Sequence, residues 1–417
     1  MPLKIQLSIA FGLAIGLAGC ATTESVPHNA ALLEKPQSHS GHKSHCGQAS
    51  AAPSIKCSDT VTATSDANGM LWIAWVDGGH VYLQALTDNG QHFSEPMMVN
   101  AEPEAIAARG ENRPKLKLDK EGNIFLTWTQ SLEKRHTGNI RFSRSTDGGK
   151  SFSTPMTIND NLDIIGHSFD SLEIGKNGEI FIAWLDARDK VRAKVGNEEF
   201  RGSSLYYTWS GDGGKSFQPN RIVAPHSCEC CRLATAIDVD NLPVVMWRQV
   251  FEGGIRDHAS IKFIDWNTPG AIRRASQENW KIDACPHHGP ALSISEAGIY
   301  HAVWFSGEGE QPGLYYAYSS DAGLTYSPVY RFGRQGKHPT VSAMGQNVAI
   351  AWSEYDGTDN QLMLIESKDA GKTWSAPIQL GKTRDSSDDA FLLNDGENFY
   401  VSWQTKQGYR IEAIAFE

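Results

Sequence analysis

The sequence predicts an all-β protein built from repeated antiparallel units. Its 417 residues include 39 Gly, 18 Pro and 12 Trp, a composition typical of many short strands joined by turns. The length exceeds that of one ordinary compact core, so either two domains or a repeat architecture is expected. A repeat is visible, because an apolar strand ending in Trp recurs seven times at intervals of 48 to 63 residues. The seven strands end at Trp75, Trp128, Trp184, Trp247, Trp304, Trp352 and Trp403.

The N-terminus has the pattern of an export signal. Residues 1–19 contain Lys4 and an apolar run that is too short to cross a bilayer. The run ends in Leu-Ala-Gly-Cys20, which resembles the lipobox of bacterial lipoproteins. This resemblance implies a lipid on Cys20, a membrane partner, and a position in the bacterial cell envelope, at the outer membrane on its periplasmic side or surface. Ordinary secretion is the alternative.

Residues 20–54 are predicted to form a flexible tether. They are rich in Ala, Ser, His, Pro and Lys and show no hydrophobic periodicity. The stretch H-S-G-H-K-S-H-C, residues 39–46, either holds a soft metal or is a solvated linker. Residues 55–417 are expected to be a single folded domain. The net charge of −10 argues against a nucleic-acid partner, because nucleic acids require a basic surface.

A second motif, S-x-D-x-G-x-[ST]-aromatic, follows the third strand of most units. Its Asp is expected to accept hydrogen bonds from backbone N–H groups at a strand-turn-strand corner, and its Gly to take a positive φ. The aromatic residue is expected to pack under the neighbouring strand. A structural role is therefore predicted for Asp147, Asp212, Asp321 and Asp369. Residues 86–93 form a degenerate fifth copy.

The motif resembles the Asp-box, or BNR, repeat of sialidases and related β-propellers. The resemblance implies a sialidase-like, seven-bladed β-propeller of four-stranded antiparallel blades, one blade more than sialidases have. The fourth unit lacks the Asp-box and the last unit ends after its third strand. Residues 54–57 are therefore expected to add an outer strand and close the ring. The expected blades are residues 60–98, 109–158, 167–223, 231–276, 288–332, 338–380 and 388–417.

The loops between blades are expected on the face opposite the Asp-boxes, around the axis. Two of them, H-S-C-E-C-C-R at 226–232 and C-P-H-H-G-P at 285–290, are far apart in sequence but predicted to be neighbours in space. Thiolates and imidazoles at short spacing suit Cu(I) or Zn(II), so a metal site is one interpretation. Its ligands would be Cys228, Cys230, Cys231, Cys285, His287 and His288.

Two other interpretations of these cysteines stay open. A disulfide from Cys228 or Cys230 to Cys285 would join the two loops, because thiols outside the cytoplasm tend to oxidise. An adjacent Cys230–Cys231 bridge would be strained and easily reduced, which suits redox chemistry. A small ligand, a glycan or a protein partner at the axial face is compatible with each of these interpretations.

The resemblance to sialidases also implies an enzyme alternative, an exo-sialidase-type glycoside hydrolase. Sialidases clamp the substrate carboxylate with three arginines, since a planar guanidinium forms two parallel hydrogen bonds with it. They use a Tyr nucleophile with a Glu, and an Asp as acid. The matching candidates here are Arg113, Arg232 and Arg256 for the clamp, Glu354 and Tyr355 for the base and nucleophile, and Asp170 or Asp257 for the acid. The cysteine loops occupy the place of the sugar, which favours a lipid-anchored propeller that binds a metal or a partner.

Overall fold

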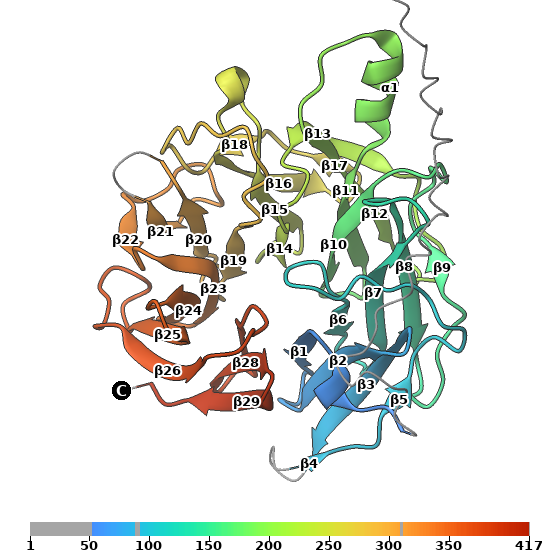
Figure 1. Cartoon of the computed structure of the whole chain (residues 1–417), viewed down its shortest axis with the longest axis horizontal. Coiled ribbons are helices and arrows are strands. Elements are labelled where there is room, and N and C mark those ends of the chain that lie inside the picture. The colour runs from blue at the N-terminus through green and yellow to red at the C-terminus, as the bar shows by residue number, and fades with distance from the viewer. Residues whose placement is uncertain (1–51, 88–91, 309–311, 417) are drawn as a thin grey trace, which may run out of the picture. The chain divides into compact units, whose positions relative to one another are not determined.

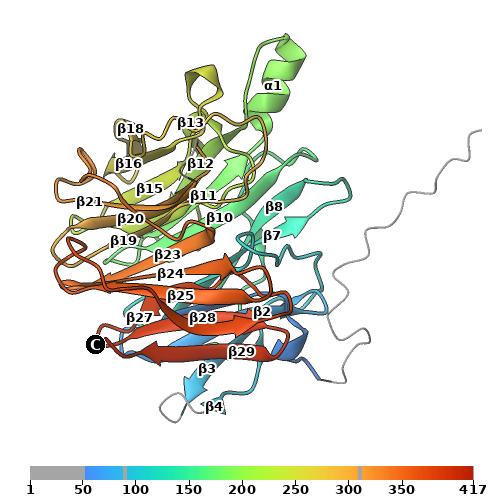
Figure 2. The same cartoon turned by 60° about the vertical axis from the view of Figure 1, so that its left-hand side comes forward.

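Seven antiparallel sheets form a ring, and each sheet is one blade of a β-propeller (Figure 1). The computed structural model describes residues 52–87, 92–308 and 312–416. Each blade is built from strands that are consecutive in the chain, so the pairing within a blade is local. Figure 2 shows the sheets from the side, stacked one beside the next. The prediction of an all-β, seven-bladed propeller is confirmed.

Within each blade, the first strand in the chain lies nearest the axis and the later strands lie progressively farther out. Blade one contains β1 (Val61–Ser65), β2 (Leu71–Asp77), β3 (His80–Thr87), β4 (His92–Phe93) and β5 (Met97–Met98). Blade two contains β6 (Lys115–Leu118), β7 (Ile124–Ser131), β8 (Gly138–Ser145) and β9 (Met156–Thr157). Blade three contains β10 (His167–Ile174), β11 (Ile180–Asp186), β12 (Ser203–Ser210) and β13 (Arg221–Ser227). Blade four contains β14 (Ala234–Ile237), β15 (Pro243–Arg248), β16 (His258–Asp265), β17 (Thr268–Pro269) and β18 (Arg273–Arg274).

The remaining three blades complete the ring. Blade five contains β19 (Ala291–Ile294), β20 (Tyr300–Ser306), β21 (Gly313–Ser319) and β22 (Tyr330–Phe332). Blade six contains β23 (Gly336–Met344), β24 (Asn347–Tyr355), β25 (Asn360–Ser367) and β26 (Ile378–Thr383). Blade seven contains β27 (Phe391–Asn394), β28 (Phe399–Thr405) and β29 (Gly408–Ile414). Because the strands alternate in direction, the loops before each inner strand and those after each Trp strand share one face of the ring, here called the loop face.

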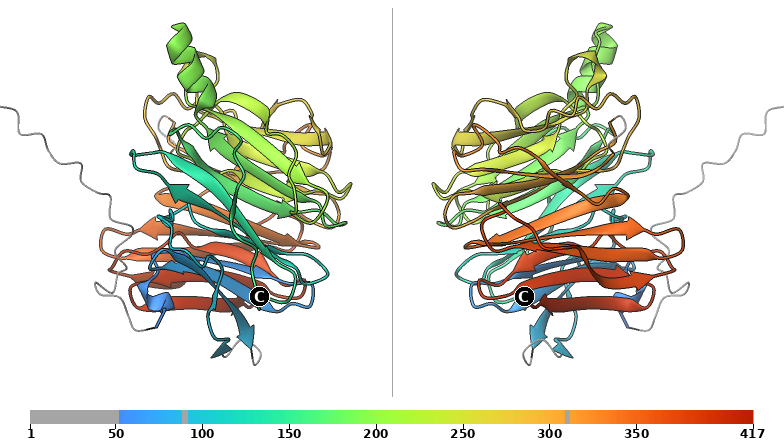
Figure 3. Two further views of the ribbon diagram at one scale, coloured as in Figure 1. Left: turned by 90° about the vertical axis from the view of Figure 1, so that its right-hand side faces the viewer. Right: turned by 90° about the vertical axis from the view of Figure 1, so that its left-hand side faces the viewer.

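Among the described residues, one α-helix interrupts this pattern. Helix α1 (Arg188–Gly196) lies between β11 and β12 and projects from the ring (Figure 3). Asn197 ends it in the left-handed conformation, and its N–H donates to the carbonyls of Ala193 and Lys194. Among the described residues, no helix has the length and apolar character needed to cross a bilayer.

The recurrent Trp residues form the centre of each blade. All seven are at most 3% exposed. A buried indole N–H needs an acceptor, and each of the seven has one. The acceptors are Gln84 Oε1 for Trp75 (2.8 Å), Glu104 Oε2 for Trp128 (2.8 Å), Asp186 Oδ2 for Trp184 (2.9 Å), Gln249 Oε1 for Trp247 (2.7 Å), Glu278 Oε2 for Trp304 (3.1 Å), Glu354 Oε2 for Trp352 (2.8 Å) and the Asp388 carbonyl for Trp403 (3.2 Å).

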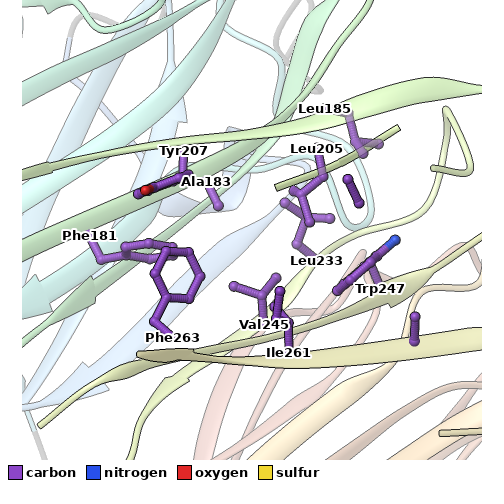
Figure 4. Packing of buried hydrophobic residues seen from close by; sticks show 12 residues of the cluster. Phe181, Ala183, Leu185, Leu205, Tyr207, Leu233, Val245, Trp247, Ile261 and Phe263 are labelled. Atoms are coloured by element: carbon purple, nitrogen blue, oxygen red, sulfur yellow. The ribbon is translucent and has the colours of Figure 1, made fainter. Parts of the chain in front are cut away.

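Apolar side chains from adjacent blades form the core between them. Between blades three and four, Phe263 of β16 packs edge-on against two aromatic rings of blade three (Figure 4). Its centroid lies 5.2 Å from that of Phe181 and 4.8 Å from that of Tyr207. Leu205 of β12 and Val245 of β15 belong to the same buried cluster. Each blade therefore depends on its neighbours to bury its faces.

The Asp-box corners have the geometry that the motif predicts. Asp147 Oδ1 accepts hydrogen bonds from the Ser145 hydroxyl at 2.7 Å and the Ser151 N–H at 3.0 Å, and Gly149 has a φ of +85°. The same contacts recur at Asp212, Asp321 and Asp369. The aromatic residues of the motif pack against the cores between blades, namely Phe152, Phe217, Tyr326 and Trp374.

The ring closes by packing rather than by strand addition, so the predicted outer strand at residues 54–57 is wrong. Ile55–Cys57 forms a short 3-10 helix, and blade seven has three strands among the described residues. The Gln404 side chain explains this, because its amide donates to the carbonyls of Ile55 and Ser58 at 3.3 and 3.1 Å. Phe391 and Leu393 of blade seven pack against the apolar cluster of blade one.

The predicted lipid anchor lies outside the described residues. Cys20 and the part of the tether up to residue 51 are not among them, so acylation and the metal-binding role of the tether histidines stay predictions.

We expect the Asp-boxes to make the propeller sensitive to acid in a defined pH range. Hydrogen bonds from the Thr373 hydroxyl and N–H lower the pKa of Asp369 to about 2, whereas an unfolded chain has a value of about 3.9. A lowered pKa stabilises the folded state fully above about pH 4, and this stabilisation is lost as the pH falls towards 2. Asp369→Asn should therefore lower the melting temperature at neutral pH and flatten its decline below about pH 4.

Thermal unfolding followed across a pH series measures this effect. The exposed Asp283, which lies outside every Asp-box, provides the matched control Asp283→Asn. If Asp369→Asn and the control show the same acid profile, the motif does not stabilise the corner in this way.

Candidate functional site

The two cysteine-bearing loops lie side by side on the loop face, as predicted. Glu111, in the loop before blade two, joins them. Its Oε2 accepts a hydrogen bond from the Arg232 N–H and another from the Gly289 N–H, each at 3.2 Å. Arg232 and Gly289, which follow Glu111 by 121 and 178 positions in the sequence, are thereby held at one carboxylate.

Three thiols form a buried cluster in the first loop. Cys228, Cys230 and Cys231, the thiol cluster, are 1%, 6% and 2% exposed. The Cys228 sulfur lies 3.9 Å from that of Cys230 and 3.2 Å from that of Cys231, and all three are free thiols. Hydrogen bonds from the Cys230 and Cys231 thiols lower the pKa of the Cys228 thiol, and the charge of Arg248 acts in the same direction. The predicted disulfides of Cys228 or Cys230 with Cys285, and of Cys230 with Cys231, are absent among these four thiols.

Two arginines flank the thiol cluster. Arg256 Nη1 lies 3.3 Å from the Cys228 sulfur and 3.4 Å from Glu229 Oε2. Arg248 is 1% exposed and donates to the carbonyls of Arg256 and His288 at 2.7 and 2.9 Å. Within the described part of the chain, Arg248 forms no ion pair with a carboxylate. Its positive charge is therefore buried without an acidic partner, and it acts on the Cys228 thiol.

The second loop contributes one thiol and one imidazole to the same region. Cys285 is an exposed residue whose sulfur contacts Cys230. Partial desolvation raises the pKa of the Cys285 thiol, while the contact with Cys230 acts in the opposite direction. Cys285 and His287 line one cavity together with Cys230. His288 is turned away from the sulfurs, because its ring packs between those of Phe305 and His338, at 4.4 and 4.7 Å. The structure thus separates His288 from the other predicted ligands.

An ion cluster lies at the axis beside these loops. Glu111 Oε1 contacts the Arg232 guanidinium at 3.1 Å and His338 Nδ1 at 3.0 Å, and Asp389 approaches the same imidazole at 3.4 Å. Although burial opposes it, the hydrogen bond to Glu111 and the two carboxylate charges raise the pKa of His338. Despite burial, the charge of Arg232 lowers the pKa of Glu111. These four residues, the axial ion cluster, are mutually neutralising.

A cavity of about 1090 Å³ opens on the loop face beside the thiol cluster. Its walls come from the β7–β8 loop, the start of α1, and the loops that carry Cys230 and Cys285. Four lining residues carry a positive charge and one, Glu229, carries a negative charge. The positive residues are Arg109, Lys134, Arg135 and Lys190.

The three arginines predicted as a carboxylate clamp already have partners. Arg113 forms a bidentate ion pair with Asp388, in which Nη1 and Nη2 donate to the two carboxylate oxygens at 2.7 and 2.6 Å, and it is 6% exposed. Arg232 is held by Glu111 and by the carbonyls of Pro290 and Pro339. Arg256 is held by the thiol cluster, by Glu229 and by the Ile282 carbonyl. The structure places them on the loop face, but none presents a free guanidinium.

The predicted acid, base and nucleophile have separate local roles. Asp170 is buried and accepts hydrogen bonds from two threonine hydroxyls of β7. Asp257 accepts from Arg274 and from the N–H groups of residues 279 and 280. Glu354 is the indole acceptor of blade six, and Tyr355 is 48% exposed at the end of β24. Among the described residues, neither Glu354 nor Tyr355 forms a hydrogen bond or ion pair with any of the three arginines.

Reasoning from the sequence did not select Arg248, Glu111 or the cavity lysines as site residues. Arg248 directly follows a recurrent Trp, and Glu111 stands two residues before Arg113, so proximity to motifs was the available signal. Their roles depend on partners in other blades, which spacing does not reveal.

Comparison with known proteins supports the fold. No protein-family model and no curated protein matches the chain. An ulvan lyase of polysaccharide lyase family PL25, solved with -[GlcA(1-4)Rha3S]- bound, is similar at 10% identity over 86% of this chain and 94% of that chain, with a TM-score of 0.55. An α-L-arabinanase from Penicillium chrysogenum, complexed with arabinobiose, is similar at 14% identity over 72% and 92%, with a TM-score of 0.51.

A leech intramolecular trans-sialidase is also similar, at 11% identity over 83% of both chains and with a TM-score of 0.50. At such identities the likeness shows the fold alone. The chain is a propeller of the kind found in sialidases, a polysaccharide lyase and a glycosidase.

Glu111 is expected to be a principal support of the loop face. Glu111→Ala should lower the free energy of unfolding by about 3–5 kcal/mol, because it leaves the largely buried Arg232 guanidinium without its carboxylate. Denaturant unfolding of the full chain measures the change. Glu121, whose side chain is 56% exposed beside Lys120, provides the control Glu121→Ala, with an expected change within about 0.5 kcal/mol. Equal effects in the two variants would refute the role of Glu111.

Proposed function

We propose that this propeller binds an acidic carbohydrate, one with uronate or sulfate groups, in the loop-face cavity. The charge of the cavity wall carries this proposal. Four lysines and arginines face one acidic residue there, although the whole chain has a net charge of −10. A positive wall in a negative protein concentrates anionic ligands, because a cleft focuses the electrostatic field.

The size and lining of the cavity fit a sugar chain. Its volume of about 1090 Å³ is slightly above the usual range for ligand sites, roughly 300–1000 Å³. Ser203 and Asn112 contribute a hydroxyl and an amide group to the cavity lining, and Phe169 belongs to the same lining. Such a surface offers both hydrogen-bond partners and an apolar face. We therefore expect several sugar units to be accommodated.

The fold supports a carbohydrate ligand by analogy. The similar ulvan lyase and arabinanase were solved with carbohydrates bound. The lipobox-like sequence at Cys20 is consistent with this ligand class. A protein anchored in the cell envelope would meet acidic carbohydrates outside the cytoplasm.

Binding is proposed in preference to the exo-sialidase alternative. A sialidase clamp needs guanidinium groups that are free to receive the substrate carboxylate. Arg113 and Arg232 are each paired with a buried carboxylate, and Arg256 is held beside the thiol cluster. Lys134, Arg135 and Lys190, in contrast, are exposed. The available positive charge is therefore in the cavity rather than at the axis.

Charge reversal in the cavity tests the proposal. Lys134→Glu/Arg135→Glu should weaken binding of a chondroitin sulfate hexasaccharide by about tenfold, because two attractive charges become repulsive. Titration calorimetry at low ionic strength measures the affinity, and added salt should weaken wild-type binding. Lys215→Glu/Lys372→Glu, in two Asp-box corners, is the control of equal charge. Equal binding of neutral cellohexaose, or equal effects of the two double variants, would contradict the proposal.

A sialoside assay separates binding from the enzyme alternative. A fluorogenic sialoside should be hydrolysed no faster by the wild-type protein than by Arg113→Lys, because Arg113 is already occupied by Asp388. Fluorescence release over time measures the rate. Turnover on the order of 1–10³ s⁻¹, the usual enzymatic range, that falls in Arg113→Lys would favour the exo-sialidase alternative.

A further inference from the structure

We infer that the thiol cluster binds one soft metal ion, Cu(I), through three sulfurs. The inference is independent of the carbohydrate proposal, since it rests on a different set of side chains. Cys228, Cys230 and Cys231 are buried, and their sulfurs all lie within 4.8 Å of one another.

The sulfur separations are those of metal ligands. Sulfurs at about 2.3 Å from a shared ion, spread evenly around it, lie about 4 Å apart. The observed separations from Cys228 are 3.9 and 3.2 Å, far longer than the roughly 2.05 Å of a disulfide. The Cys228–Cys230 separation therefore matches that of two ligands on one ion, and the Cys228–Cys231 separation is shorter.

The backbone holds the turn in place before any ion binds. The Cys228 N–H donates to the Arg248 carbonyl at 2.8 Å, and the Val250 N–H donates to the His226 carbonyl at 2.7 Å. Ser227 and Gln249 form a bridge between these two contacts. The cysteine turn is therefore fixed to the segment that follows β15, which favours a preformed site.

The charges around the cluster favour a thiolate complex of a monovalent ion. Three thiolates and one Cu(I) carry two net negative charges. Arg256 supplies one positive charge 3.3 Å from the Cys228 sulfur, and Arg248, whose guanidinium donates to the Arg256 carbonyl, supplies a second one nearby. A buried charge is tolerated only when it is paired. Arg248 has carbonyl acceptors but no carboxylate among the described residues. The metal–thiolate group would be the missing counter-charge, with Glu229 approaching Arg256 from the more exposed side.

The number of ligands distinguishes copper from zinc. Structural zinc sites have four ligands, whereas Cu(I) is a soft ion that thiolates select. Among the described residues, the group of sulfurs that all lie within 4.8 Å of one another has three members, Cys228, Cys230 and Cys231. Cys285 contacts Cys230 from the cavity side, and His288 is packed against Phe305. Because Cys230 lines the cavity, an ion can reach the cluster from there.

The test titrates the reduced full chain with Cu(I) held by the chromophoric chelator bicinchoninate, without oxygen. Wild-type protein should remove about one Cu(I) per chain, as a single soft-ligand site requires. Cys228→Ser/Cys231→Ser should lose at least about tenfold in affinity. Cys285→Ser should retain Cu(I), and so should the tether variant His39→Ala/His42→Ala/His45→Ala.

A second measurement does not depend on the folding of a variant. The X-ray absorption spectrum of the wild-type Cu(I) complex should show a first shell of sulfur alone. Nitrogen in that shell, loss of binding in the tether variant, or no copper uptake would overturn the inference. Tighter binding of Zn(II) that requires Cys285 would overturn the choice of ion. No sugar is present, so these results do not depend on the carbohydrate proposal.

Discussion

The loop face depends on one buried carboxylate. A ring of seven blades brings the starts of seven inner strands to one axis, and the loops there carry charged groups that water does not fully reach. Burying a charge is unfavourable unless a partner of opposite sign lies close. Glu111, whose side chain is 4% exposed, satisfies this requirement for Arg232 and His338, and it also binds the backbone of both cysteine-bearing loops. The positions of blades two, four, five and six at the axis are thus linked through one side chain.

This arrangement places two kinds of chemistry next to each other. Arg232 belongs to the axial ion cluster and directly follows Cys231 of the thiol cluster, so the contact that fixes one also orients the other. Oxygen and nitrogen groups pair at the axis, whereas the sulfurs of the thiol cluster lie beside Arg256, whose Nη1 is 3.3 Å from the Cys228 sulfur. The last residue of the thiol cluster, Cys231, and the arginine of the axial ion cluster, Arg232, are therefore adjacent in the chain.

The fold was predictable because its signals are local and repeated. Each Trp strand and each Asp-box is complete within about ten residues, and the indole acceptor often stands two residues after its Trp, as Asp186 and Glu354 do. The segment at residues 54–57 has no such pattern. Its conformation depends on Gln404, which is 349 residues away from Ile55. The expectation that residues 54–57 complete the last blade as a fourth strand did not take that distant contact into account.

The site was predictable only in part, for the same reason. The repeat correctly indicated which loops share a face, and hence that Cys230 and Cys285 are neighbours. It did not indicate the direction of individual side chains. For example, His287 lines the cavity, whereas the adjacent His288 packs against Phe305. Nor did it show that Arg113 is paired with Asp388, 275 residues away.

That pairing shows how to separate charges that hold the fold from charges available to a ligand. Arg113 and Arg232 are on the loop face, as a clamp would require, yet each is committed to a carboxylate within the protein. Displacing those carboxylates would cost the stability they provide, so a substrate anion gains little there. Lys134 and Arg135 lie in a loop outside the ion network and are exposed. An anionic ligand can approach them without breaking any contact on which the ring depends.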